Sequence, residues 1–475
     1  MKNNATGKIY SIFQYLFLVL MGLVLSFILP ALFSAAAVSY FCIMAAVFSG
    51  IFFILYRKNI SDRVYAAVIS VMTISMLVFQ ILYFRQGVYV PKPPGDPEAV
   101  YVGVKELVIN GRFLESNWYY LAYPHQLFST FIYAVANRVF VYAGMEGPIS
   151  HFATYTLNAF MTCMGFVLFC LGIKRISDNK ISLFSGFLFF VNLSYYSSVR
   201  YIYPHELSVF FICAVIFLSC VFFTEKRNKQ RYLKAAALGF TTAVALSVEG
   251  IFAIALIAVA IVIMLLPRGT SRVISEILCL SAGFFIALLL INLLYASMSV
   301  IDRTDEEKYK FPVSHWIAMG LSESGMFNQD DYDIVIGSET KLEKQDQTAS
   351  LIKERFTSRG LFETIGFYYN KEKTVWIGSF YGQSISAIDR SAYNKAYRGL
   401  LFVMIFLSQL FQIIQKKKAY EKKDIENFAF AKIWICGLFL FFLIWEVSPV
   451  YLFSSLPIVI FAASQAFVNI DYLNK

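Results

Sequence analysis

Apolar runs long enough to cross a lipid bilayer recur along the whole chain, for example from Tyr10 to Pro30 and from Ile277 to Met298. A hydrocarbon core about 30 Å thick requires ~20 consecutive apolar residues per helix. Backbone groups inside lipid must also satisfy one another's hydrogen bonds, which favours helices. The short alternating strands of a membrane β-barrel are absent from the sequence. The chain is therefore predicted to be an all-α polytopic membrane protein.

The composition agrees with this prediction, because only 15% of the 475 residues are charged, against about 25% in soluble domains. A single transmembrane domain over residues 1–475 is expected, with no separate soluble domain. The net charge of +10 could suit nucleic acid. However, residues 300–397 contain 12 Lys/Arg and 15 Asp/Glu, so the rest of the chain carries +13 in short connectors. Basic connectors mark cytoplasmic loops, and no nucleic-acid partner is predicted.

When every basic connector is placed in the cytoplasm, the apolar runs form about twelve spans and both termini lie in the cytoplasm. The spans are expected near residues 10–30, 34–56, 64–84, 152–173, 181–200, 205–224, 233–248, 250–266, 275–297, 398–415, 428–446 and 449–469. Two segments, 85–125 and 300–397, then face outward and are expected to carry short helices. The apolar stretch 126–143 does not fit this count. It is predicted to re-enter or lie along the membrane, unless a neighbouring span is miscounted.

The two outward segments hold the residues with chemical potential. Asp96 follows a proline-rich stretch, and a Tyr123-Pro-His125-Gln sequence comes later in the same segment. Asp96 could simply cap the helix that starts at Pro97, because Asp favours the N-cap and Pro the first helical position. The longer segment contains Phe311-Pro-Val-Ser-His315-Trp316, followed near its end by Lys371, Lys373 and Trp376. In the predicted topology all four histidines of the chain lie at the outer face.

In their order and spacing these motifs resemble the GT-C superfamily of integral-membrane glycosyltransferases. More narrowly, the chain is similar to bacterial enzymes related to protein O-mannosyltransferases and aminoarabinose transferases. The matching residues are Asp96-Pro-x-x-Val, then Tyr123-Pro-His-Gln, then Phe311-Pro-x-Ser-His-Trp-x-x-Met-Gly-Leu, and finally Lys371 to Trp376. The resemblance implies a GT-C fold and transfer of a sugar from a polyprenyl-phosphate donor to a glycan, lipid or teichoic-acid-type acceptor of the cell envelope. The active site would lie at the outer membrane face.

Carried onto this chain, the resemblance makes Asp96 the general base, because a carboxylate can take the proton of an acceptor hydroxyl. Glu98 would assist it. The donor phosphate needs cationic or hydrogen-bond-donating partners, and His315 and Arg200 are the preferred candidates. The other residues expected to bind the donor or acceptor are Tyr123, His125, His205, Trp316, Lys371, Lys373 and Trp376. No metal ligand set is predicted, although a divalent cation is left open because Asp96 and Glu98 alone supply too few ligands.

Two departures from the family pattern stand near span ends. Tyr203-Pro-His205-Glu206 replaces the Tyr-Thr-Asp type of sequence, and Ser247-Val-Glu249 replaces Lys-Pro-Thr. The donor site is therefore expected to be built differently. Two alternative functions also remain. A polysaccharide polymerase or ligase would use paired outer arginines, which are missing. A transporter of lipid-linked sugars would place polar residues in mid-membrane, whereas here they lie at span ends.

Overall fold

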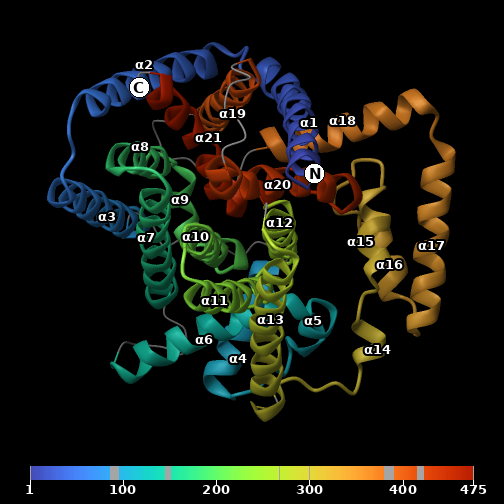
Figure 1. Cartoon of the computed structure of the whole chain (residues 1–475). Coiled ribbons are helices and arrows are strands. Elements are labelled where there is room, and N and C mark those ends of the chain that lie inside the picture. The colour runs from blue at the N-terminus through green and yellow to red at the C-terminus, as the bar shows by residue number, and fades with distance from the viewer. Residues whose placement is uncertain are drawn as a thin grey trace.

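The computed structural model describes residues 2–85, 96–144, 151–266, 268–298, 300–378, 390–414 and 422–473. Helices make up most of these residues, and none of them forms a strand. The prolines before Asp96 and most of the basic connector 416–423 lie outside the described ranges. Figure 1 shows the helices arranged as a bundle, with the segment from α14 to α18 folded against one side of it.

Twelve helices stand where twelve spans were predicted. They are α1 (Lys2–Ala31), α2 (Ala35–Arg57), α3 (Asp62–Arg85), α7 (His151–Ile176), α8 (Asn179–Phe190), α10 (Pro204–Phe223), α11 (Asn228–Leu246), α12 (Phe252–Leu265), α13 (Thr270–Met298), α19 (Arg390–Ile414), α20 (Lys422–Ile444) and α21 (Tyr451–Leu473). Within the described ranges, eight are long and apolar enough to cross a membrane unaided: α1, α2, α3, α7, α10, α13, α19 and α21. α12 and the part of α20 from Phe428 to Ile444 are also apolar, but they are shorter than these eight helices. The prediction of an all-α polytopic membrane protein is confirmed.

The span predicted over 181–200 is interrupted. α8 ends at Phe190 after 12 residues, and the chain continues as α9 (Ser194–Ser197) and the 3₁₀ helix η2 (Ser198–Arg200). Asn192 contributes to the break, because its Oδ1 accepts a hydrogen bond from the Ser194 N–H at 3.2 Å, and such local bonds compete with the helix. Tyr397 and Tyr393 of α19 donate to the carbonyls of Leu188 and Val191 at 2.7 and 2.6 Å. The free end of α8 is thereby capped inside the bundle.

The apolar stretch 126–143 forms α6 (Leu127–Tyr142), which follows α4 (Asp96–Ile109), α5 (Asn117–Ala122) and the 3₁₀ helix η1 (Pro124–Gln126). Figure 1 shows α6 lying across the lower end of α7. Arg138 ties α6 to α4, since its Nη2 donates to the Leu107 carbonyl at 2.8 Å. A helix of 16 residues is only about 24 Å long. This length is less than the thickness of the hydrocarbon core, and the statement that α6 re-enters or lies along the membrane stays a prediction.

α11 and α13 pack side by side through two glycines (Figure 1). A Cβ atom on Gly239 would collide with the carbonyl oxygen of Leu280, and one on Gly283 would collide with that of Ala236. Small residues allow helices in membranes to approach closely where apolar burial alone does not drive association. The two glycines therefore set the distance between α11 and α13.

The described part of the long predicted loop, residues 300–378, contains five helices: α14 (Glu306–Tyr309), α15 (Val313–Gly320), α16 (Gln329–Ile336), α17 (Lys341–Ser358) and α18 (Leu361–Ile377). Two backbone hydrogen bonds join this segment to the turn between α20 and α21. The N–H of Glu446 donates to Trp316 at 3.2 Å, and that of Val447 donates to Gly325 at 2.9 Å. Gly325 accepts this geometry because its φ is +69°, a value that favours glycine.

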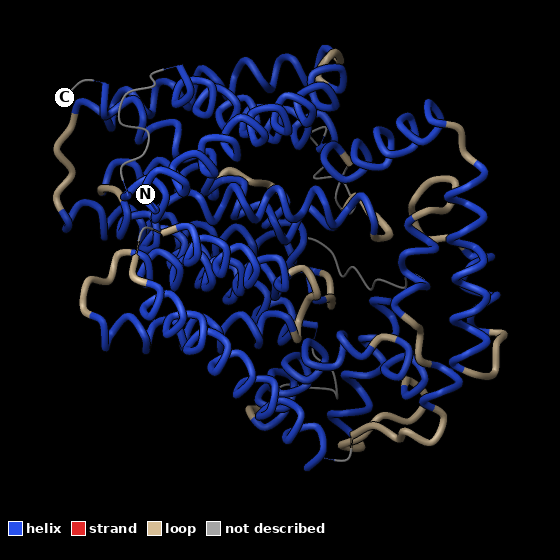
Figure 2. Tube along the Cα trace, turned by 45° about the vertical axis from the view of Figure 1, so that its right-hand side comes forward, coloured by secondary structure: helices blue, strands red, loops and turns tan. Residues whose placement is uncertain are grey.

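The basic connectors meet one another at one end of the bundle. Lys174 forms an ion pair with Asp62 at 2.8 Å, which joins the α7–α8 connector to the start of α3. Arg231 and Arg268 both reach Glu276, which joins the α10–α11 connector to that between α12 and α13. Figure 2 shows both chain ends on the same side of the bundle. This common end is what the predicted topology requires, and its cytoplasmic location stays a prediction.

The close approach of α11 and α13 predicts an unequal response to alanine at two helical glycines. Gly239→Ala should lower the melting temperature of the detergent-solubilised protein, because overpacking typically costs about 1–3 kcal/mol. Gly366→Ala in α18 is the matched control. No atom lies within 4 Å of a Cβ placed there, and alanine favours helices by up to ~1 kcal/mol over glycine. Equal melting temperatures for the two variants would contradict the packing described.

The topology predicts that two exposed positions lie on opposite sides of the membrane. In a cysteine-free background, Glu339→Cys should react with an impermeant thiol reagent in intact cells. Lys229→Cys should react only after the cells are permeabilised, because it lies in a basic connector. Labelling of both positions in intact cells would show that the basic connectors do not mark the cytoplasmic face.

Candidate active site

Asp96 lies where two cavities meet. The first, which we name the Asp96–Glu249 cavity, has a volume of about 340 Å³. The second, the Asp96–Glu98 cavity, has a volume of about 630 Å³ and is more open to the surface. Tyr123 and Phe327 also line both cavities. Volumes of this size accommodate small ligands, so Asp96 can contact two different molecules at once.

Six separate parts of the chain supply the polar and aromatic lining of the Asp96–Glu249 cavity. They are the start of α4, η1 with the residue before it, the start of α10, the turn between α11 and α12, helix α15, and the turn between α20 and α21. The side chains that matter for the chemistry are Asp96, Tyr123, His125, Gln126, Tyr203, His205, Glu249, Trp316, Trp445, Glu446 and Tyr451. Residues more than 350 positions apart in sequence thus share one cavity.

The carboxylate of Asp96 is held by Tyr203, whose hydroxyl donates to Oδ2 at 3.0 Å. Gln126 in turn donates to the Tyr203 hydroxyl at 3.2 Å. Burial raises the pKa of Asp96 above its ordinary value, and the hydrogen bond from Tyr203 offsets part of that rise. A carboxylate with a raised pKa is a stronger base than an exposed one. Asp96 is therefore both oriented and made more basic.

His205 and Glu249 form a buried pair on the wall of the same cavity. Nδ1 of His205 lies 3.0 Å from Oε1 of Glu249, and the hydroxyl of Ser454 donates to the same oxygen at 3.1 Å. Burial opposes the ionisation of Glu249, but the charge and hydrogen bond of His205 outweigh it and hold the pKa of Glu249 below its ordinary value. The carboxylate thus fixes a proton on Nδ1. Nε2 of His205 is buried and has no partner among the described residues.

Glu446 is a cavity residue that the sequence analysis missed. It follows α20 and is 6% exposed. Burial raises its pKa to about 7, and the charge of Asp96 contributes to the rise. The sequence held a usable signal, because an acidic residue at the end of an apolar run is a candidate functional residue. Glu249 carries the same signal at the end of another run.

The Asp96–Glu98 cavity is shaped by the segment that follows α4. Glu106 organises this segment, since its carboxylate accepts hydrogen bonds from the N–H groups of Leu114, Glu115 and Ser116 and from the Ser116 hydroxyl. Burial opposes the ionisation of Glu106, but these bonds outweigh it and lower its pKa. The lining of this cavity includes Glu98, Glu115, Trp118, Tyr119, Gln329 and Tyr332. A polar ligand with hydroxyl groups would find both acceptors and aromatic faces here.

An aromatic wall joins the two outward segments beside Asp96. The Tyr123 ring contacts Phe311 at a centroid distance of 5.5 Å and Trp316 at 5.7 Å. Trp316 also stacks on Trp445 at 6.2 Å with an interplanar angle of 17°. Offset aromatic pairs at such distances stabilise packing beyond the area that they bury. The wall therefore fixes the position of α15 relative to α20.

The structure separates the predicted site residues into two groups. The Asp96–Glu249 cavity is lined by Asp96, Tyr123, His125, His205 and Trp316, and the Asp96–Glu98 cavity is lined by Glu98. Neither cavity is lined by Arg200, His315, Lys371, Lys373 or Trp376. Lys373 is exposed on α18. The roles predicted for this second group at the donor phosphate stay untested.

Arg200 and His315, the preferred partners of the donor phosphate, both contact aromatic rings. The Arg200 guanidinium lies 4.2 Å from the Tyr83 ring centroid and donates to the Tyr83 carbonyl. His315 is fully buried and stacks on Phe311 at 4.5 Å. Burial lowers the pKa of His315 to about 4, so the ring is neutral at pH 7. Both side chains pack the protein next to the site.

Lys371 and Trp376 are buried side chains that form hydrogen bonds within the protein. The Lys371 ammonium donates to the carbonyls of Gly320 at 2.5 Å and Leu443 at 3.1 Å, near the ends of α15 and α20. Cations stabilise the C-terminal ends of helices. The Trp376 ring is fully buried, and its Nε1 donates to Glu372 at 2.7 Å. These residues hold the outer helices against the bundle.

Neither a protein-family model nor a curated protein sequence matches the chain. Solved structures do match. The crystal structure of the Archaeoglobus fulgidus oligosaccharyltransferase tethered with an acceptor peptide aligns with a TM-score of 0.53 and 13% identity, over 87% of this chain and 50% of that one. The archaeal oligosaccharyltransferase AglB from the same organism, in complex with an inhibitory peptide and a dolichol-phosphate, aligns with a TM-score of 0.51 and 12% identity, over 86% and 50%.

The chain spans about half the length of these structures. At such low identity the likeness concerns the fold, which agrees with the resemblance that the motifs carry. The chain is a multi-pass membrane protein whose fold is similar to that of these archaeal oligosaccharyltransferases.

Proposed function

We propose that this protein is a glycosyltransferase that moves a sugar from a polyprenyl-phosphate donor to a hydroxyl of a glycan or lipid acceptor of the cell envelope, at the outer face of the membrane. The observation that carries the proposal is the carboxylate of Asp96, which two cavities share. A transferase must bring two substrates to one base. The fold supports the proposal, because the aligned AglB structure contains a dolichol-phosphate.

We assign the donor to the Asp96–Glu249 cavity. Its wall presents the unpartnered Nε2 of His205, whose other nitrogen is held by Glu249. When His205 is protonated, Nε2 can donate a charge-assisted hydrogen bond to a phosphate oxygen. His125 lies on the same wall. In this proposal, histidines supply the hydrogen-bond donors to the phosphate.

We assign the acceptor to the Asp96–Glu98 cavity, which is the larger and more open of the two. Asp96 takes the proton of the acceptor hydroxyl while the oxygen bonds to the anomeric carbon of the donor sugar. The bond between that carbon and the phosphate oxygen breaks, and polyprenyl phosphate leaves. Asp96 contributes as a general base, and Tyr203 keeps its carboxylate in place.

The sequence left a divalent cation open. Among the described residues, no three His, Cys, Asp or Glu side chains lie close enough together to hold a metal ion. No step of the proposed transfer is routed through a metal ion.

Asp96→Asn should lower the transfer rate by about 10²–10⁴-fold, the usual contribution of a general base. Asn keeps an oxygen for the Tyr203 hydroxyl but has almost no basicity. The measurement is release of polyprenyl phosphate from a labelled donor by the detergent-purified protein, with the melting temperature recorded in parallel. Asp305→Asn, at an exposed position outside both cavities, is the matched control and should retain the wild-type rate.

Asp96→Ala separates catalysis from helix capping. If Asp96 only capped α4, Asn would replace it almost without effect, because Asn and Asp cap equally well. Only Ala would then be harmful, through a lower melting temperature. A near-normal rate for Asp96→Asn would exclude Asp96 as the base and make Glu98 the next residue to test. Absence of donor turnover in the wild type would instead favour a transporter.

Glu446→Gln should leave the acidic limb of the pH–rate profile in place. Asp96 must be ionised to act as a base, so activity is present above its pKa and is lost as the pH falls through it. Burial and the charge of Asp96 raise the pKa of Glu446 to about 7, so Asp96 ionises first and Glu446 is neutral while it does so. Glu323→Gln, at an exposed position, is the matched control. A shift of the acidic limb in Glu446→Gln but not in the control would mean that Glu446 is ionised before Asp96.

A further inference from the structure

One face of α18 is buried at its C-terminal end by transmembrane helices. Five residues follow one another on this face at intervals of three or four positions: Leu361, Ile365, Tyr369, Glu372 and Trp376. Residues at such intervals share one side of a helix. The Trp376 ring packs against Phe402 of α19 at a centroid distance of 5.3 Å and against Phe442 of α20 at 6.3 Å. This end of the face is thus covered by the apolar part of the bundle.

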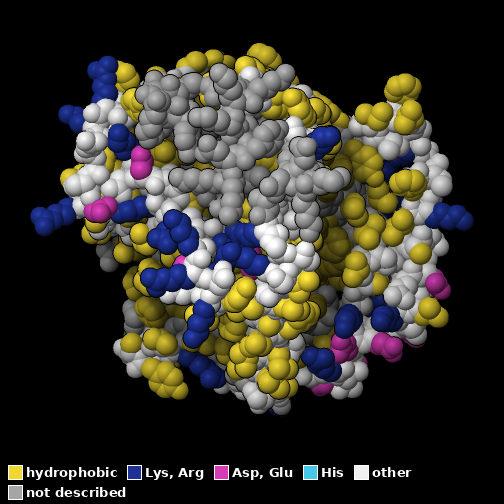
Figure 3. Space-filling model, viewed as in Figure 1, with side chains coloured by type: hydrophobic (Ala, Val, Ile, Leu, Met, Phe, Trp, Pro, Cys, Tyr) yellow, Lys and Arg dark blue, Asp and Glu magenta, His cyan; other side chains and the backbone are white. Residues whose placement is uncertain are grey.

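The N-terminal half of the same face is apolar and exposed. Leu361 is 72% exposed, the adjacent Phe362 86%, and Ile365 58%. Figure 1 shows this half of α18 leading away from the bundle toward α17, and Figure 3 shows hydrophobic side chains gathered over that region. Exposed apolar patches mark sites that contact proteins or membranes. We name Leu361, Phe362, Ile365 and Tyr369 the α18 stripe.

Contacts between Tyr369 and α1 place the α18 stripe at the level of a membrane span. The Tyr369 hydroxyl donates to the Ser26 carbonyl at 3.2 Å, and its ring contacts the Phe27 ring edge to face at 4.7 Å. α1 is long and apolar enough to cross a membrane and ends at Ala31, so Ser26 lies about 8 Å before that end. Leu29, near the same end of α1, is 45% exposed. Lipid that covers α1 would therefore also reach the α18 stripe.

α18 is fixed to the segment that forms a wall of the candidate site. Arg359, just before the helix, donates from Nη2 to the carbonyls of Leu321 at 2.8 Å and Ser322 at 3.1 Å, at the end of α15. Its guanidinium also lies 3.9 Å from the centroid of the Phe367 ring in α18. α15 carries Trp316, which lines the Asp96–Glu249 cavity. A contact that holds α18 at the membrane therefore also holds this wall in place.

We propose that the α18 stripe is embedded in the outer leaflet of the lipid bilayer and anchors the segment 300–378 to the membrane. An amphipathic helix lies in the membrane interface with its apolar face toward the acyl chains. The rest of the exposed surface of α18 suits this position, because it carries the polar side chains Glu363, Asn370 and Lys373. Lipid is the expected occupant, because the stripe continues a face that already packs on transmembrane helices. The proposal does not depend on the glycosyltransferase activity.

The test uses the whole protein, free of cysteine except at one labelled position, in vesicles of phosphatidylcholine and phosphatidylglycerol. Ile365→Cys carries a nitroxide spin label, and electron paramagnetic resonance measures its collisions with oxygen and with a water-soluble nickel chelate. Oxygen concentrates in lipid, whereas the chelate stays in water. The ratio of oxygen to chelate collisions should be several-fold higher at Ile365→Cys than at Asn370→Cys, which lies about 140° further around the helix.

Two outcomes would overturn the proposal. Equal ratios at the two positions would show that the α18 stripe faces water. Few collisions with either reagent at Ile365→Cys would show that protein covers the stripe, as in a contact between two copies of the chain. Leu361→Cys is a second reporter on the stripe with the same expected ratio, and it decides the matter if Ile365→Cys does not fold.

Discussion

Contact between the segment 300–378 and the turn that joins α20 to α21 determines the shape of the candidate site. Lys371 binds carbonyls near the ends of α15 and α20, while Glu446 and Val447 bind the backbone on either side of Gly320. Gly320 permits this approach, because a Cβ atom there would lie 2.5 Å from the Ile444 carbonyl oxygen. Trp316 and Glu446 then face the same cavity as Asp96. Without this junction the cavity would lack one wall.

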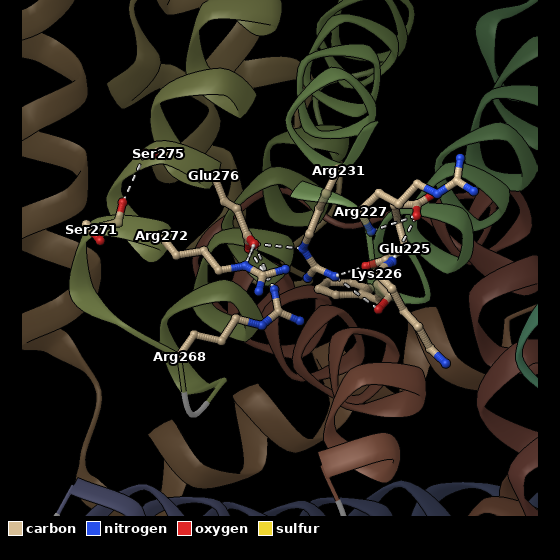
Figure 4. Close-up of polar contacts among 10 residues, drawn as sticks. Glu225, Lys226, Arg227, Arg231, Arg268, Ser271, Arg272, Ser275 and Glu276 are labelled. Carbon is tan, nitrogen blue, oxygen red and sulfur yellow. Dashed lines mark hydrogen bonds and ion pairs between the residues drawn. The ribbon is translucent and has the colours of Figure 1, made fainter. Parts of the chain in front are cut away.

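The electrostatic design of the two ends of the molecule differs. Three carboxylates, Asp96, Glu249 and Glu446, surround the Asp96–Glu249 cavity, and the basic side chains that line it are histidines. Burial raises the pKa of Glu446 to about 7, so the charge of this cavity depends on pH. At the other end, the arginines that bind Glu276 (Figure 4) stay charged at all physiological pH values.

The sequence predicted the fold well, because span length and basic connectors are local properties that a single chain displays. The predicted topology put Asp96, His125 and His205 at the outer face, and the structure brings the three to one cavity. Glu446 was missed because its proximity to Asp96 arises from tertiary contacts 350 residues apart. His315, Lys371 and Trp376 stand in motifs that suggested chemistry. The structure places them in packing and helix-end contacts, which use the same side-chain types. The break at Asn192 depends on one side-chain hydrogen bond inside an apolar run.

The capped end of α8 also limits how the protein can move. Tyr393 and Tyr397 satisfy carbonyls at the end of α8, and an unsatisfied backbone group in hydrocarbon costs several kcal/mol. Sliding of α8 past α19 would therefore break these bonds. An opening that admits a lipid-linked substrate costs less free energy when it displaces other elements and leaves this pair in place.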